Sequence, residues 1–127
     1  LQNMQTGIFG YKGHVHFQTA PCINEELEAF RGLPKTEVFA RTASLIDHYI
    51  HLNYRLYPGN YIACDLLEGN QHFASRYTTE DVARFNTYLQ KKLDMISLPD
   101  KDEEFLRKCM LTMYANPVIN HQKALEE

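Results

Sequence analysis

The chain has 127 residues, of which 44% are hydrophobic and 12% aromatic, so it is too apolar for a disordered tail and we expect one folded domain. Its formal net charge of −3 argues against a nucleic-acid partner, since such proteins bind phosphates through excess Lys and Arg. No apolar run approaches the roughly 18–20 residues of a membrane span, which limits any predicted membrane contact to a peripheral one at the inner face. Three scattered cysteines without a Cys-x-x-Cys pair predict reduced thiols and a cytoplasmic protein.

The first segment with a structural signal, residues 5–19, predicts a β-hairpin or edge strand. Two short apolar stretches flank residues 10–13, and apolar and polar side chains alternate over residues 14–18. The chain enters this signal at once, without an initiator methionine or a leader, so we expect it to be the tail of a larger protein. Because an unpaired strand must be covered, we expect the hairpin to pack on the chain's own helices or to form a homodimer through residues 14–18.

Apolar residues at helical spacing then predict four or five helices. The expected helices cover residues 24–32, 36–57, 60–68, 78–96 and 105–113, with a last turn or two beyond a break at Asn116 and Pro117. The predicted fold is therefore mainly α with a small β element. Residues 1–22 form the N-terminal hairpin or edge strand, and residues 23–127 form a four-to-five-helix bundle.

The segment 36–57 has the strongest periodicity and is predicted to be the buried central helix. Its apolar face includes Leu45 and Leu52, and replacing either by alanine is expected to cost about 2 to 5 kcal/mol. His48 and His51 are expected at the surface, where His48→Ala should cost little.

The opposite face of the same helix carries the one candidate site, a polar ridge. The ridge consists of Glu37, Arg41, Ser44, His48, His51 and Arg55, and the candidate site within it is Arg41, His48, His51 and Arg55. Together with His14 and His16 its imidazoles suggest zinc, but the two arginines oppose a cation, so no metal site is predicted. Two interpretations remain open: an anion site for a phosphate head group or an acidic partner surface, and a solvated helix face, which is the simpler one.

Several stretches resemble a known family, and together they span nearly the whole chain. They read GIFGYKGHVHF at 7–17, NYRLYPGNY at 53–61, DLLEG at 65–69 and MYANPVINH at 113–121. They are similar to the segment that follows the catalytic core in a bacterial group of glycerolphosphate and lysophosphatidate acyltransferases. In that family a His-x4-Asp motif supplies the catalytic base, and a Glu-Gly-Thr-Arg-type motif binds phosphate.

This chain retains neither motif. No histidine has an aspartate five residues further on, and Glu68-Gly69-Asn70 lacks the Thr-Arg continuation, so no catalytic residue is predicted. The resemblance implies a noncatalytic C-terminal domain of a glycerolipid acyltransferase-like protein of phospholipid biosynthesis. Residues 1–22 would then complete the sheet of the upstream catalytic domain, which is the expected partner.

The resemblance also sets what the chain should and should not do. The full-length protein would take its acyl group from acyl-CoA or acyl carrier protein, whereas this chain needs no cofactor and is expected to be inactive alone. The alternative is a free-standing helical module that binds a protein or a small apolar ligand. A His-x4-Asp motif upstream of Leu1 in the reading frame favours the first interpretation, and a start codon near Leu1 favours the second.

Overall fold

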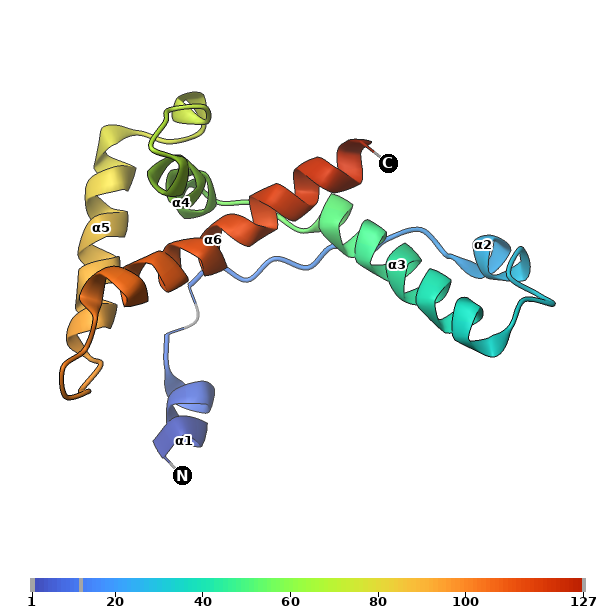
Figure 1. Ribbon diagram of the computed structural model, residues 1–127, viewed down its shortest axis with the longest axis horizontal. Coiled ribbons are helices and arrows are strands. Elements are labelled where there is room, and N and C mark those ends of the chain that lie inside the picture. Colours follow the sequence, from blue (N-terminus) through green and yellow to red (C-terminus); the bar gives the residue numbers. More distant parts are fainter. Residues whose placement is uncertain (1, 12, 127) are drawn as a thin grey trace.

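The computed structural model describes residues 2–11 and 13–126, and the elements in these ranges are helical (Figure 1). They are α1 (Gln2–Phe9), α2 (Asn24–Glu28), α3 (Lys35–Asn53), α4 (Pro58–Glu68), the 3₁₀ turn η1 (Ala74–Arg76), α5 (Thr79–Asp94) and α6 (Glu103–Glu126). Helices α4, α5 and α6 lie against one another, α3 projects from this group, and α1 stands apart from it (Figure 1). An extended arm, residues 13–23, leads from the α1 side of the molecule to α2.

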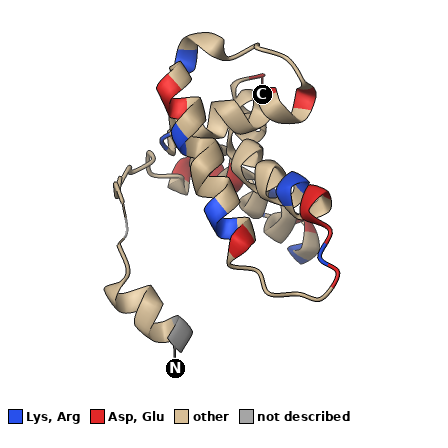
Figure 2. Ribbon diagram, turned by 90° about the vertical axis from the view of Figure 1, so that its left-hand side faces the viewer, with Lys and Arg blue, Asp and Glu red and all other residues tan. Residues whose placement is uncertain are grey.

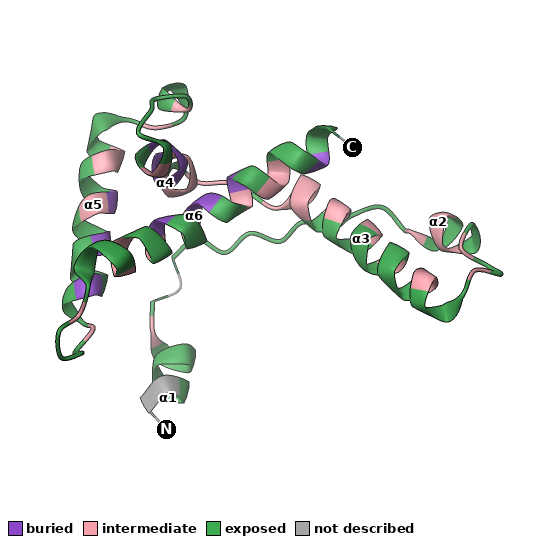
Figure 3. Cartoon of the chain, in the orientation of Figure 1, coloured by how far each residue is buried: buried purple, intermediate pink, exposed green. Residues whose placement is uncertain are grey.

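The hydrophobic core lies where α4, α5 and α6 meet (Figure 3). Its largest fully buried side chains are Ile62, Leu89, Leu93 and Val118. On α5 the buried positions are spaced four residues apart, at Phe85, Leu89 and Leu93, which is the spacing that keeps side chains on one helical face. Helix α4 approaches closely through Gly59, where a Cβ atom would meet the Phe85 ring at 3.2 Å. The four-residue spacing of apolar side chains on α5 therefore identifies the face of this helix that is buried in the core.

The prediction that residues 36–57 form the buried central helix is wrong. Helix α3 is present, but it contains no buried residue, and Leu45 and Leu52 are only half-buried. Phe39, Ile46 and Ile50 on the same helix are exposed. Helix α3 meets α6 near its C-terminal end and extends away from it, so among the described helices little packs on the rest of its apolar stripe (Figures 1 and 3).

The predicted N-terminal β-hairpin or edge strand over residues 1–22 is also wrong. Residues 2–9 form helix α1, which closes with the Gly10 amide donating to the Thr6 carbonyl at 3.0 Å, and the arm is extended without being part of a sheet. An alternating pattern becomes a strand only when a second strand pairs with it, and the described residues contain none. The fold is all-α within the described ranges.

The expected helix break at Asn116 and Pro117 does not occur, because α6 continues through Pro117 to Glu126. A proline inside a helix removes one backbone hydrogen bond. Side chains just after α3 and in the first turn of α4 supply bonds to this part of α6. The Tyr54 hydroxyl donates to the Pro117 carbonyl, and the Asn60 amide donates to the Tyr114 carbonyl at 2.9 Å. Tertiary contacts thus hold the helix together where its sequence predicts an interruption.

Candidate functional site

The polar ridge predicted on α3 is divided between different environments. Arg41 forms an exposed ion pair with Glu37 at 2.7 Å, one turn earlier on the helix. Arg55 lies beyond the end of α3, with its guanidinium 5.5 Å from the centre of the Tyr57 ring. Since these two arginines belong to different surroundings, the ridge is not one continuous cationic patch. Anion binding there stays a prediction.

The two ridge histidines were expected at the surface, but both are half-buried. The His48 ring packs edge-on against Tyr49, with the ring centres 5.6 Å apart. His51 joins α3 to α6, because the Nδ1 of His121 donates to the His51 carbonyl at 2.7 Å. Together with the bond from Tyr54 to Pro117, this contact fastens the C-terminal end of α3 to α6.

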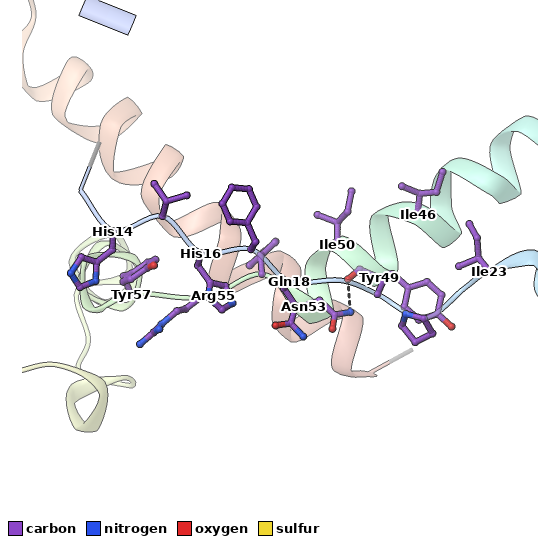
Figure 4. Close-up of a pocket in the computed structure, with 15 residues that line it drawn as sticks. His14, His16, Gln18, Ile23, Ile46, Tyr49, Ile50, Asn53, Arg55 and Tyr57 are labelled. Atoms are coloured by element: carbon purple, nitrogen blue, oxygen red, sulfur yellow. Dashed lines mark hydrogen bonds between the residues drawn. The ribbon is translucent and has the colours of Figure 1, made fainter. Parts of the chain in front are cut away.

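A groove of about 720 Å³ lies between the arm and the C-terminal half of α3 (Figure 4). From the arm it is lined by His14, Val15, His16, Phe17, Gln18, Ala20, Pro21 and Ile23, and from α3 and the following segment by Ile46, Tyr49, Ile50, Asn53, Tyr54, Arg55 and Tyr57. Its size is in the range of about 300–1,000 Å³ that small-molecule sites occupy. This groove could not be predicted from the sequence, because Ile46 and Ile50 fit the apolar stripe of a buried helix equally well.

The two ends of the groove differ in polarity. Figure 4 shows His14, Arg55 and Tyr57 toward one end, and Ile23 and Ile46 toward the other. The lining contains no aspartate or glutamate, and Arg55 is its only Lys or Arg. The chain as a whole has a net charge of −3, so this lining is locally more cationic than the molecule.

A hydrogen-bond network fixes the apolar end of the groove. The Tyr49 hydroxyl donates to Glu26 Oε1 at 2.8 Å, and this bond to a carboxylate raises the pKa of Tyr49. The Asn53 amide donates to the Tyr49 carbonyl at 2.8 Å. The first bond connects α2 to α3, and the second holds the Asn53 side chain at the C-terminal end of α3.

Two buried groups outside the groove have structural partners. Asp65 accepts from the Phe73 amide at 3.0 Å and from the Tyr77 hydroxyl at 2.6 Å, and the second bond raises the pKa of Tyr77. Cys64 donates through its thiol to the Ala115 carbonyl at 3.6 Å, and burial raises the pKa of this thiol to about 11. Asp65 therefore holds the loop after α4 in place. Because its pKa is raised, the Cys64 thiol is not activated as a nucleophile.

Comparisons with known proteins identify no relative. No family model, curated protein or solved structure matches this chain. The resemblance to acyltransferases therefore depends on the sequence motifs alone. Across residues 2–11 and 13–126, no three His, Cys, Asp or Glu side chains come together as metal ligands would. No helix in these ranges has the length and apolar character needed to cross a bilayer.

Proposed function

We propose that the chain is the noncatalytic C-terminal domain of a glycerolipid acyltransferase-like protein, and that α1 docks it onto the catalytic part. The observation that supports this proposal is the exposure of the apolar side chains of α1. Ile8 is 66% exposed and Phe9 84%, and Met4 and Tyr11 are exposed as well. Residues 4–9 of α1 are all exposed, and this helix stands apart from the other helices (Figure 3).

A helix as short as α1 needs a supporting surface. It has eight residues, whereas isolated helices shorter than about 12–15 residues are marginal in water. Residues 1–24 contain no aspartate or glutamate and a single Lys or Arg, Lys12, and α1 itself carries no charged side chain (Figure 2). Burying Ile8 and Phe9 against a partner would contribute about 1.5–3 kcal/mol for each side chain. A protein surface is therefore the fitting environment for this helix.

The identity of the partner follows from the sequence motifs. The stretch at 7–17, which resembles the segment after an acyltransferase catalytic core, includes the exposed side chains of Ile8 and Phe9. The catalytic part would carry the His-x4-Asp base and transfer an acyl group from acyl-CoA or acyl carrier protein to glycerol phosphate or a lysophospholipid. This chain would cover that part without contributing a catalytic group.

The test is to produce the polypeptide encoded upstream of Leu1 separately and to measure its association with this chain by sedimentation velocity. A complex is expected. Ile8→Asp should raise its dissociation constant by roughly 10- to 150-fold, which corresponds to losing the free energy of burying the Ile8 side chain. Leu125→Asp is the matched control, because Leu125 on α6 is apolar and also 66% exposed. Equal weakening by both substitutions, or no complex, contradicts docking through α1. An upstream polypeptide without a His-x4-Asp motif contradicts the acyltransferase assignment.

The groove beside α3 supports a second candidate, a helical module that binds a small apolar ligand. Its volume and its mainly apolar lining are typical of ligand sites. The two candidates are compatible, because α1 is not among the elements that line the groove.

A further inference from the structure

The cationic end of the groove has one guanidinium donor, Arg55. In the described part of the chain, three arginines are paired with a nearby carboxylate, whereas Arg55, like Arg76 and Arg107, forms no ion pair. Its guanidinium lies over the Tyr57 ring, an arrangement that orients the group and leaves its N–H donors open. A guanidinium with open donors binds a carboxylate through two parallel hydrogen bonds. One end of the groove is therefore suited to a single anionic group.

The remainder of the groove is suited to a hydrocarbon chain. Ile23, Ile46 and Ile50 line it together with Val15 and Phe17. Phe17 is 90% exposed and Ile50 52%, so these side chains have apolar surface left to bury. The neighbouring Tyr49 hydroxyl already donates a hydrogen bond to Glu26, so its proton needs no polar group from the ligand. Apolar surface of this kind gains free energy when a hydrocarbon covers it.

From these two features we propose that the groove binds a fatty acid anion with a chain of about 12 carbons. The carboxylate lies at Arg55, and the hydrocarbon chain runs along the isoleucines toward Ile23 and Ile46. A volume of about 720 Å³ fits a ligand of this size, whereas a partner protein covers a wider surface. The absence of acidic side chains from the lining favours an anionic over a cationic amphiphile. The inference goes beyond the docking of α1 and does not depend on it.

The first test is calorimetric titration of the chain with laurate below its micelle concentration. One saturable site per chain is expected. Each buried methylene changes affinity by about fourfold, so octanoate, which is four methylenes shorter, should bind roughly 250-fold more weakly. Dodecyltrimethylammonium has a chain of the same length with a cationic head, and it should not saturate the site. Absence of a saturable laurate site, or equal binding of the cationic amphiphile, overturns the proposal.

The second test uses substitutions with matched controls on α3. Arg55→Gln removes the cation, and Ile50→Glu places an anion in the apolar part, so each should weaken laurate binding at least tenfold. Arg41→Gln and Phe39→Glu make the same chemical changes at exposed positions outside the groove lining, and they should leave binding within twofold. Far-UV circular dichroism checks that each variant is folded. If the controls weaken binding as much as the groove variants, or if Arg55→Gln has no effect, the proposal is wrong.

Discussion

The position of the core predicts an unequal response to two leucine truncations. Leu89 on α5 is 0% exposed, whereas Leu45 on α3 is half-buried. Leu89→Ala should cost about 3 kcal/mol, because it removes buried methyl groups and leaves a cavity in close-packed surroundings. Leu45→Ala should cost about 1 kcal/mol, because its side chain is already partly in water. The helix with the strongest apolar periodicity is thus predicted to be the more tolerant one.

These costs translate into separate melting temperatures. With an unfolding entropy of about 2.1 cal/mol/K per residue, a chain of 127 residues has about 0.27 kcal/mol/K, so Leu89→Ala should lower Tm by about 11 °C. The same conversion gives about 4 °C for Leu45→Ala. Thermal unfolding followed by far-UV circular dichroism measures both shifts, and the helical content supplies a strong signal. A loss at Leu45 equal to that at Leu89 would place the core on α3 and refute the reasoning.

Four further predictions concern single side chains. Thr78→Ala should cost about 1 kcal/mol in urea unfolding, because Thr78 caps α5, and an unchanged midpoint would contradict this. Hydrogen bonds from Thr78 lower the pKa of Asp81. The stability that this carboxylate contributes is therefore complete above its ordinary pKa of 3.8 and is lost as pH falls through the lower pKa of the folded state. If acid does not destabilise the wild type more than Asp81→Asn in this pH range, the assignment is wrong. With a maleimide at pH 8, the two exposed cysteines should react rapidly and buried Cys64 slowly, because only about one part in a thousand of the Cys64 thiol is thiolate at this pH. Equal rates for all three thiols would argue against the burial of Cys64. Tyr54→Phe should cost about 1 kcal/mol and speed amide exchange in α3 more than in α5, and a uniform change would show that the hydroxyl does not hold α3 in place.

Local patterns predicted the helices well where the chain itself supplies the partner surface. The Thr78 cap and the spacing of Phe85, Leu89 and Leu93 define α5, and the helix expected over residues 60–68 is α4, which begins two residues earlier, at Pro58. In these elements the apolar residues lie against neighbouring helices, so the period of the sequence and the buried face agree. Element type was therefore predictable from sequence in this half of the molecule.

The errors arose where a pattern requires a partner that the described chain does not provide. The alternation over residues 14–18 is typical of a strand, and the stripe on α3 is typical of a buried helix, but both are largely uncovered. The groove was missed for the same reason, since periodicity shows which residues share a face and not which surface covers that face. Pro117 predicted a helix break that does not occur, because the Tyr54 hydroxyl, 63 residues earlier in the sequence, forms a hydrogen bond to α6 at this point.

Hydrogen exchange of α1 tests the central claim most directly, namely that the chain is a helical core with an uncovered N-terminal docking element. In the chain alone, residues 2–11 should exchange close to the rate of a free peptide, while the buried parts of α4, α5 and α6 exchange far more slowly. In complex with the upstream polypeptide, residues 4–10 should slow at least tenfold, with little change in α5. Protection of α1 in the isolated chain, or unchanged exchange in the complex, would contradict the account.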